Sequence, residues 1–275
     1  IEIDIDTLKY KDLVTNNIVA QFYFENESQL ILENLGIDYK QSQAQIHGQV
    51  NAYNTALSLN NTANFDINFN IQAQGETKDL NDYFGNSNFL FDSGQFKFKG
   101  NYEAKSENFV LSTSEATGRL QLTPSVIEFK AAELFIPIDT LDLAIKNNKA
   151  TINSLQLRLK SNDYINVSGN IDNFSGLVSK NSEDQIHSSR FLIYSPNLDT
   201  DDIDEILLDA RMGKPKPSNE AKKDLALLKN SLLDLKKSFH PELEVKIDTF
   251  SYQKFKITHL KSNLFFDQKD NIHLK

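Results

Sequence analysis

A chain of 275 residues that is 39% hydrophobic is long enough to bury a substantial core. Its formal net charge of -9 excludes the basic surface of a nucleic-acid binder, and the lack of cysteine excludes disulfides, thiolate metal sites and cysteine nucleophiles. The sequence contains no run of about 18 apolar residues, the length that a membrane-spanning helix needs. Because the first residue is Ile1, we expect the chain to be part of a longer protein with an anchor upstream.

Alternation of apolar and polar residues runs through most of the chain. It is clearest at residues 1–5, 65–71, 96–98, 120–122, 134–138, 141–145, 155–159 and 243–247. Such alternation is typical of antiparallel strands with one apolar and one polar face. Turns are predicted at residues 25–28, 146–149 and 267–270 and at Gly75, Gly94, Gly100 and Gly118. We expect roughly 14 to 18 strands in a mainly β fold.

Helical patterns are few. Residues 218–239 carry one apolar stripe at alternating steps of four and three, which predicts a long amphipathic helix between Pro217 and Pro241. This helix either plugs one end of the sheet or lies on a membrane surface. Two short helical turns are predicted at residues 77–84 and 201–209.

The chain contains an internal repeat. Ile1–Glu33 aligns with Leu243–Lys275 without a gap, and seven of the aligned pairs are identical. A fainter similarity links residues 33–51 with residues 153–172. We therefore expect one continuous sheet made of a first unit at residues 1–84, a variant continuation at 85–180, a strand with a helical insertion at 181–242, and the start of a further unit at 243–275.

The predicted helices are too few to cover the apolar face of such a sheet. One helix lying along the strands is only ~10 Å across and hides about two of them. The remaining apolar surface either packs on itself in a barrel or sandwich, meets another protein, or curls into a trough that holds an apolar ligand.

Two parts of the sequence resemble the AsmA-like family of bacterial envelope proteins, relatives of TamB. In residues 3–84, paired strands end in a small-residue segment at 44–48, and an alternating strand at 65–73 and a short helix at 79–84 follow. In residues 191–208, "FLIYSPNLDTDDIDEILL" is similar to the family's strand, proline and acidic helix start. The resemblance covers residues 1–84 and 190–275, whereas residues 85–185 agree only in general character.

The resemblance implies a long, curved antiparallel sheet that forms a trough with an apolar lining. It also implies a periplasmic protein that is anchored in the inner membrane by an upstream helix and that carries phospholipids between membranes or supports outer-membrane assembly. The candidate lining residues are the alternating apolar ones: Ile1, Ile3, Ile5, Leu30, Leu32, Phe65, Ile67, Phe69, Ile71, Phe96, Phe98, Leu120, Leu122, Leu155, Leu157, Leu159, Val245 and Ile247.

The sequence gives less support for an enzyme or a metal-binding protein than for a lipid-binding one. The acidic run at residues 199–205 lacks the glycine and the spacing of a calcium loop, and the five histidines lack metal-ligand spacing. Asp4 and Asp6 lie on the polar side of a predicted strand, and a carboxylate pair of a sugar-acting enzyme is the weakest alternative. We expect no enzymatic activity, cofactor or metal. The alternative to a lipid-binding segment is a self-packed β scaffold or adhesion module of the cell envelope without a ligand.

Overall fold

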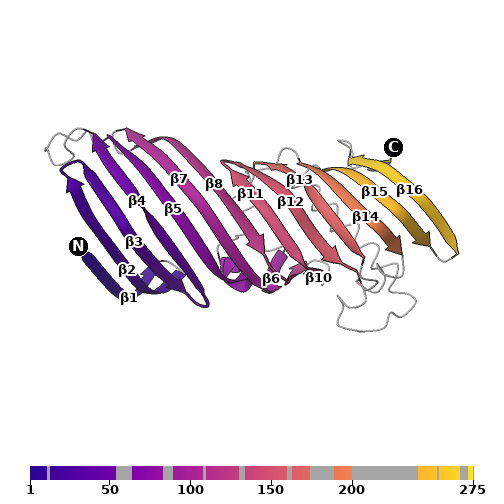
Figure 1. The fold of residues 1–275 in the computed structure, drawn as a ribbon, viewed down its shortest axis with the longest axis horizontal. Coiled ribbons are helices and arrows are strands. Elements are labelled where there is room, and N and C mark those ends of the chain that lie inside the picture. Colours follow the sequence, from indigo (N-terminus) through magenta and orange to yellow (C-terminus); the bar gives the residue numbers. More distant parts are fainter. Residues whose placement is uncertain are drawn as a thin grey trace. The chain divides into compact units, whose positions relative to one another are not determined.

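The computed structural model describes residues 1–10, 13–53, 64–82, 89–107, 110–129, 134–159, 163–173, 189–199, 241–252, 254–266 and 272–274. These residues form 17 strands and a single short helix, so the protein is mainly β (Figure 1). Fourteen of the strands belong to a large, mostly antiparallel sheet, and three form a small one. The predicted mainly β character and the expected number of strands are confirmed.

The structure divides into two compact units. The first comprises Ile1–Asp82, Gln95–Gln121 and Ala144–Asn147, and the second comprises Tyr83–Gly94, Leu122–Leu143 and Asn148–Lys275. In the first unit the strands of the large sheet follow one another in hydrogen-bonded order. They are β1 (Glu2–Tyr10), β2 (Leu13–Asn26), β3 (Gln29–Tyr39), β4 (Ser42–Tyr53), β5 (Asn64–Glu76), β7 (Gln95–Glu107) and β8 (Val110–Leu122), whose last residue is grouped with the second unit.

The second unit contains the other strands of the large sheet and the whole small sheet. The large-sheet strands are β11 (Thr140–Lys146), which contributes residues to both units, β12 (Lys149–Arg158), β13 (Tyr164–Asp172), β14 (Ser189–Asp199), β15 (Pro241–Tyr252), β16 (Phe255–Phe266) and β17 (Ile272–Leu274). The small sheet has the order β10 (Leu134–Ile138), β9 (Ser125–Phe129) and β6 (Phe89–Ser93), and β10 contacts β12.

One pair of strands departs from the predicted antiparallel pattern. β14 and β15 run parallel, with Ser189 opposite Pro241 and Asp199 opposite Ser251. Parallel neighbours need a long connection to return the chain to the same end of the sheet, and 41 residues separate these two strands. The predicted short turn at 201–209 and the predicted long helix at 218–239 fall in this connection, outside the described residues.

The third predicted helical turn is described in part. Thr77–Asp82 forms the 3-10 helix η1 directly after β5, while residues 83 and 84 lie outside the described residues. Among the predicted turns, those at residues 25–28 and 146–149 join β2 to β3 and β11 to β12. Gly94 lies between β6 and β7 with a φ of 120°, as a turn glycine does.

Three other glycines were predicted to mark turns, and this was wrong. Gly75, Gly100 and Gly118 lie inside β5, β7 and β8. The reason for two of them is the ring of Phe98, because a Cβ atom would lie 2.7 Å from Phe98 Cζ at Gly100 and 2.6 Å from Phe98 Cε2 at Gly118. These two glycines leave room for an aromatic side chain on the face of the sheet instead of reversing the chain.

The internal repeat is present in the strand register. Tyr10 lies opposite Leu13 at the end of the β1–β2 hairpin, and Tyr252 lies opposite Phe255 at the same place in β15–β16. Each further pair of one hairpin maps onto a pair of the other with the same offset of 242 residues, up to Glu2 with Gln21 and Glu244 with Asn263. The aligned sequences therefore form the same local structure.

Candidate functional site: the apolar face of the sheet

In the first unit, the register of the strands gathers apolar side chains into rows that cross the sheet. Residues directly opposite each other on neighbouring strands point to the same face. One row links Ile3, Ala20, Leu35, Ile46, Ile71 and Gly100 across six strands. A second links Phe24, Leu30, Val50, Ile67 and Ala104, and a third links Ile37, Ala44, Ala73 and Phe98.

A β-bulge in β3 keeps the rows apolar. Leu32 and Leu35 are three positions apart, which in a regular strand would place them on opposite faces. The register shifts between them, however, so that Leu32 lies opposite Gly48 and Leu35 opposite Ile46. The two intervening residues face one residue of β4, and both leucines point to the apolar face.

The same bulge recurs in the second unit. Ile152 lies opposite Gly169 and Leu155 opposite Val167, again with a register shift between them. This is the place where residues 153–172 resemble residues 33–51, so the fainter similarity in the sequence also corresponds to a shared irregularity of the sheet.

Phenylalanine rings cover the glycines of these two segments. Gly48 is paired with Phe69, and Gly169 is paired with Phe191. A Cβ atom at Gly48 would lie 2.9 Å from Phe69 Cδ1, and one at Gly169 would lie 2.7 Å from Phe191 Cδ1. Each ring therefore fills the space that a larger residue on the neighbouring strand would take, which is the aromatic rescue seen in β-sheets.

Most side chains in the rows of the first unit are only partly covered. Ile1 keeps 69% of its surface exposed and Ile3 keeps 41%. Leu30, Val50 and Ile67 are half-buried, although they lie in the interior of the sheet. A residue enclosed between two packed layers would be almost completely buried. Within the described part of the first unit, the apolar face thus remains partly accessible.

The structure places many of the predicted lining residues on this one face. The register aligns those of β1, β3, β5 and β7, namely Ile1, Ile3, Ile5, Leu30, Leu32, Phe65, Ile67, Phe69, Ile71, Phe96 and Phe98. Leu120 follows Gly118 by two positions in β8 and thus shares the face that contacts Phe98, and both Leu120 and Leu122 are buried.

The predicted lining residues of the second unit also share one face there. Leu155 belongs to a row with Val167, Ile193 and Val245, and Leu157 lies opposite Ile165. Leu159 and Ile247 are only 2% and 6% exposed and form a cluster with Leu198. The second unit therefore has a closed core at this point.

Sequence reasoning missed several residues of the apolar rows. Leu35, Ile37, Ile46, Val50 and Phe24 belong to these rows but were not among the predicted lining residues. Simple alternation does not predict the bulge after Leu32. The sequence signal that identifies it is the similarity to residues 153–172, because Ile152, directly before that segment, is also three positions from Leu155.

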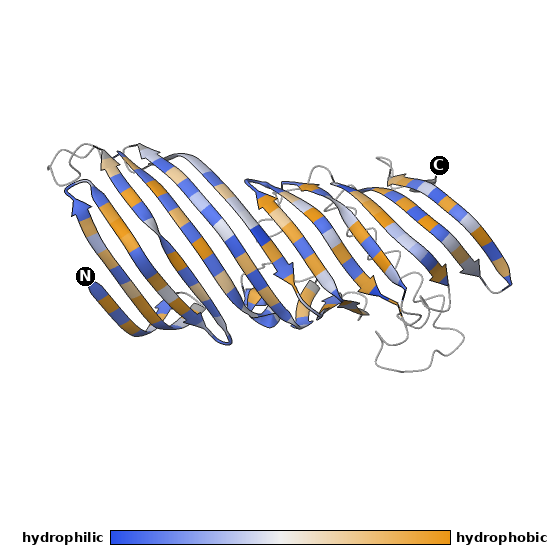
Figure 2. Ribbon diagram, in the orientation of Figure 1, coloured by the Kyte–Doolittle hydropathy of each residue, from blue (hydrophilic) through white to orange (hydrophobic). Residues whose placement is uncertain are grey.

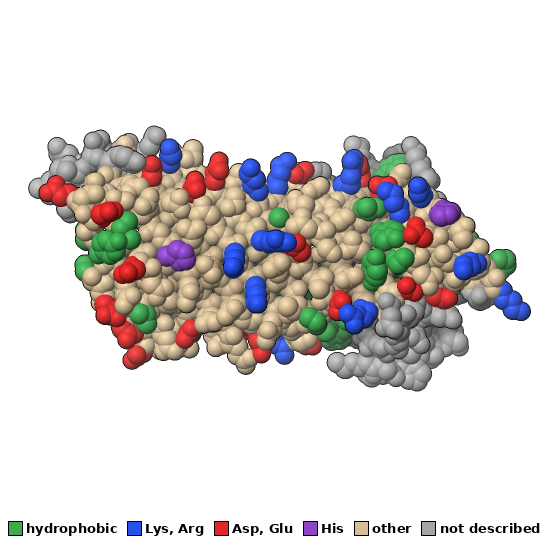
Figure 3. Space-filling view, in the orientation of Figure 1, with side chains coloured by type: hydrophobic (Ala, Val, Ile, Leu, Met, Phe, Trp, Pro, Cys, Tyr) green, Lys and Arg blue, Asp and Glu red, His purple; other side chains and the backbone are tan. Residues whose placement is uncertain are grey.

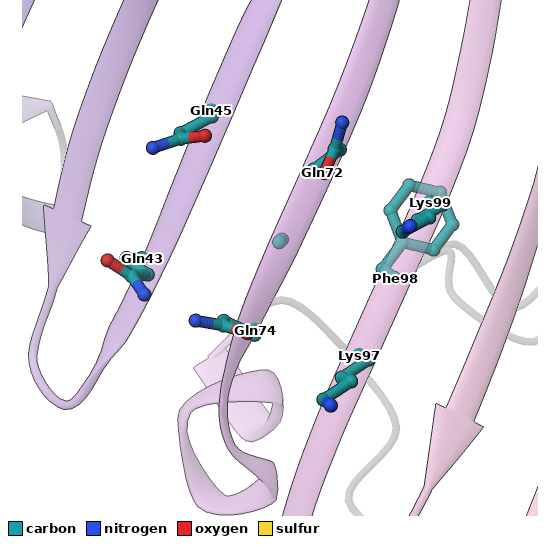
Figure 4. Close-up of a pocket in the computed structure, with 8 residues that line it drawn as sticks. Gln43, Gln45, Gln72, Gln74, Lys97, Phe98 and Lys99 are labelled. Carbon is teal, nitrogen blue, oxygen red and sulfur yellow. The ribbon is translucent and has the colours of Figure 1, made fainter.

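The opposite face of the sheet in the first unit is polar. Glutamine and asparagine side chains of β4 and β5 alternate with the apolar residues, which Figure 2 shows as alternating colours along the strands. A depression of about 160 Å³ is lined by six polar residues of this face and also by two residues of the apolar row, Ala73 and Phe98; the six are Gln43, Gln45, Gln72, Gln74, Lys97 and Lys99. Figure 4 shows the glutamines and lysines of this set along β4, β5 and β7. In the space-filling view, charged side chains are scattered and hydrophobic ones are confined to a few places (Figure 3).

A group of polar residues fastens η1 to the turn between β3 and β4. The buried Asp79 carboxylate accepts hydrogen bonds from Ser42 Oγ at 2.6 Å and from the Gln41 backbone N–H at 3.1 Å. Asp82 accepts hydrogen bonds from Lys40 Nζ at 2.5 Å and from Tyr39 Oη at 2.8 Å. These contacts connect the end of β5 with the strands that carry the apolar rows.

The charges of this group shift its titration. The hydrogen bond from Lys40 is the main cause that lowers the pKa of the Asp82 carboxyl, and the same bond raises the pKa of Lys40. Burial, together with the bond to Asp82, raises the pKa of Tyr39. All three shifts favour the charge states that these groups hold at neutral pH.

Among the described residues, no three or more His, Asp or Glu side chains are grouped so that they could hold a metal ion. Of the residues with described positions, none belongs to a helix that is long and apolar enough to cross a membrane. The chain matches no family model, no curated protein and no solved structure.

Proposed function

We propose that this chain is a non-enzymatic segment of an AsmA-like envelope protein, and that the apolar face of its sheet binds the acyl chains of phospholipids. The observation that supports the proposal is the partial exposure of the apolar rows in the first unit. Contiguous rows of partly exposed apolar side chains are uncommon on monomeric soluble proteins unless they bind something.

The energetics of an acyl chain fit such a surface. Transfer of a CH₂ group out of water is favourable by about 0.8 kcal/mol, so moving a 16-carbon chain from a bilayer into water costs about 13 kcal/mol of free energy. A row over six strands extends for about 24 Å at a spacing of ~4.8 Å. One leaflet of the hydrocarbon core is about 15 Å thick, so a single row is long enough for one chain.

In this proposal, the apolar face lines a trough along which lipids move between the membranes, and the headgroups stay in solvent at its rim. The protein lies in the periplasm and is held at the inner membrane by an upstream anchor. Lipid movement along a continuous apolar lining needs no chemical step, because the cost of exposing the chain is reduced at every position.

Analysis of co-purifying lipid tests the proposal. The chain is expressed in a bacterial host, purified without detergent, extracted with organic solvent and analysed by mass spectrometry. We expect phospholipid in the extract in an approximately stoichiometric amount. A lipid-free protein that also fails to take up labelled phospholipid from vesicles would favour the alternative, a self-packed scaffold or adhesion module.

A further inference from the structure

The outer edge of β1 has a structural counterpart inside the sheet of the second unit. β1 pairs with β2, and no described strand pairs with its other edge. Its equivalent in the internal repeat, β15, pairs with β16 on one side and with the parallel strand β14 on the other. The two hairpins have the same register, so β15 shows what a β1-type edge binds when it is occupied.

The side chains of β1 are also more exposed than their equivalents in β15. Ile5 and Ile247 are equivalent, but Ile5 is 36% exposed and Ile247 is 6% exposed. Ile247 is covered because it packs with Leu198, which β14 supplies, and with Leu159. Leu8 is 48% exposed, whereas its equivalent Phe250 packs against this cluster. The apolar side chains of β1 thus lack the cover that a β14-type strand gives.

The backbone of β1 is also available for pairing. Ile1 and Phe22 exchange two backbone hydrogen bonds, of 2.8 and 3.0 Å. In an antiparallel pair such residues alternate with residues whose N–H and C=O groups point away from the partner strand. Ile3 and Ile5 therefore point their backbone groups toward β2, while Glu2, Asp4 and Asp6 present theirs at the outer edge.

β1 also carries polar residues at positions where β15 contacts polar residues of β14. Tyr194 Oη of β14 donates a hydrogen bond to Asp248 Oδ2 of β15 at 2.9 Å, and Asp6 is the equivalent and identical residue of β1. Asp199 lies opposite Ser251, whose equivalent in β1 is Lys9. The last residue of a β14-type strand would therefore bring a carboxylate next to a lysine.

From these relationships we infer that the outer edge of β1 is a binding site for a polypeptide strand with the pattern of β14, which adds to the sheet in parallel. The strand alternates apolar residues with polar ones, carries a tyrosine hydroxyl that reaches Asp6, and ends in an apolar residue and a carboxylate near Leu8 and Lys9. This is β-strand addition, in which main-chain hydrogen bonds supply affinity and the side chains supply specificity. The inference does not depend on lipid binding.

A synthetic peptide tests the inference. The probe is a fluorescein-labelled peptide with the sequence SRFLIYSPNLD of residues 189–199, titrated with the full chain and followed by fluorescence polarisation. We expect saturable binding, with protection of the Glu2, Asp4 and Asp6 amides from hydrogen exchange. A spin label at the amino end of the peptide should broaden the signals of Glu2 and Ile3 but not those of Lys9 and Tyr10.

Two substitutions at one position separate the edge from the side chain. Asp4→Pro removes an outward N–H and leaves the hydrogen bonds to β2 in place, and we expect it to weaken peptide binding by about tenfold or more. Asp4→Ala keeps the N–H and should bind like the unmodified chain. Circular dichroism establishes that both variants fold. A peptide carrying Leu198→Asp provides a test on the unmodified protein and should lose binding, because it lacks the apolar group that covers Ile5.

Several results would overturn the inference. Equal binding to Asp4→Pro and Asp4→Ala would mean that the peptide binds elsewhere, for instance by displacing β14 from β15. Broadening at the Tyr10 end would show antiparallel addition. Self-association of the chain that Asp4→Pro abolishes would show that the edge pairs with a second copy. Absence of binding at millimolar peptide would exclude the site.

Discussion

Asn17 and His259, which are 242 positions apart, both adopt a left-handed backbone conformation, with φ angles of 47° and 56°. Each lies in the second strand of its hairpin. Asn17 precedes Ile18, which is opposite Ile5, and His259 precedes Leu260, which is opposite Ile247. In both hairpins the regular pairing omits the left-handed residue itself, Asn17 in one and His259 in the other. The irregularity is thus a property of the repeat and not of one copy.

This conformation predicts opposite effects for two substitutions at His259. Left-handed φ values cost L-residues about 1–2 kcal/mol, and β-branched residues suffer most. We expect His259→Val to lower the free energy of unfolding by about 1–2 kcal/mol and His259→Gly to leave it unchanged or slightly higher. Urea unfolding measures both. We expect Asn17→Val and Asn17→Gly to show the same difference as the corresponding His259 variants. Equal stability of the valine and glycine variants at either position would contradict the prediction.

Phe69 over Gly48 predicts a site that does not tolerate even one methyl group. A Cβ atom at Gly48 would lie 2.0 Å from the Asn68 carbonyl oxygen as well as close to the ring. We expect Gly48→Ala to lower the free energy of unfolding by about 1–3 kcal/mol, measured by urea denaturation.

Gly36 provides the matched control for that substitution. It lies in β3, and the nearest atom to an added Cβ would be the Val19 carbonyl oxygen at 3.9 Å. Gly36→Ala should therefore be neutral or stabilising by up to about 1 kcal/mol, because alanine restricts the unfolded chain. A similar loss of stability in both variants would show that the close contacts of an added Cβ at Gly48 do not determine the effect.

Two adjacent residues of β5 separate the two faces of the sheet in a lipid assay. Ile67 belongs to an apolar row, and Asn68 points to the polar face. If the apolar face binds acyl chains, Ile67→Asp should reduce phospholipid retention by tenfold or more, because a carboxylate there opposes burial of the chain. Asn68→Asp adds the same charge and should retain lipid normally.

The folding of the Ile67→Asp variant must be tested alongside its lipid content. Ile67 is half-buried, so we expect a folded protein with a modest loss of stability by circular dichroism and urea unfolding. Complete unfolding would mean that Ile67 belongs to a sealed core, and the proposed binding face would then be wrong.

The contact between Lys40 and Asp82 predicts a stability contribution that depends on pH. The pKa of Asp82 is lowered from its ordinary value of 3.8, so its contribution is present above that value and is lost as the pH falls through the folded-state pKa. The pKa of Lys40 is raised from 10.5, so its contribution is lost only as the pH rises beyond that range.

Asp82→Asn measures this contribution. The two side chains are 38% and 53% exposed, so solvent screens the pair and we expect a loss of less than about 1 kcal/mol at pH 7. The difference between the unmodified chain and the variant should shrink as the pH falls below 4. A difference that stays constant between pH 7 and pH 2 would show that charge pairing is not its source.

Local sequence patterns were sufficient to predict the strands, because side chains alternate between the two faces of a strand wherever the chain is extended. The repeat was equally visible, since Ile1–Glu33 and Leu243–Lys275 align without a gap, and the turns at residues 25–28 and 146–149 follow from polar residues between alternating segments. Such features depend on neighbours in the chain and need no knowledge of distant residues.

Pairing between distant strands decided the rest. Alternation alone places Leu32 and Leu35 on opposite faces, and only the bulge against β4 brings both to the apolar face. Gly100 and Gly118 resemble turn residues in the sequence, but in the structure the ring of Phe98 occupies the space beside both. Ile5 and Ile247 occupy equivalent positions in the repeat, yet only Ile247 is covered, because the strand beside it comes from elsewhere in the chain. Exposure and register are properties of contacts between segments, and no local pattern contains them.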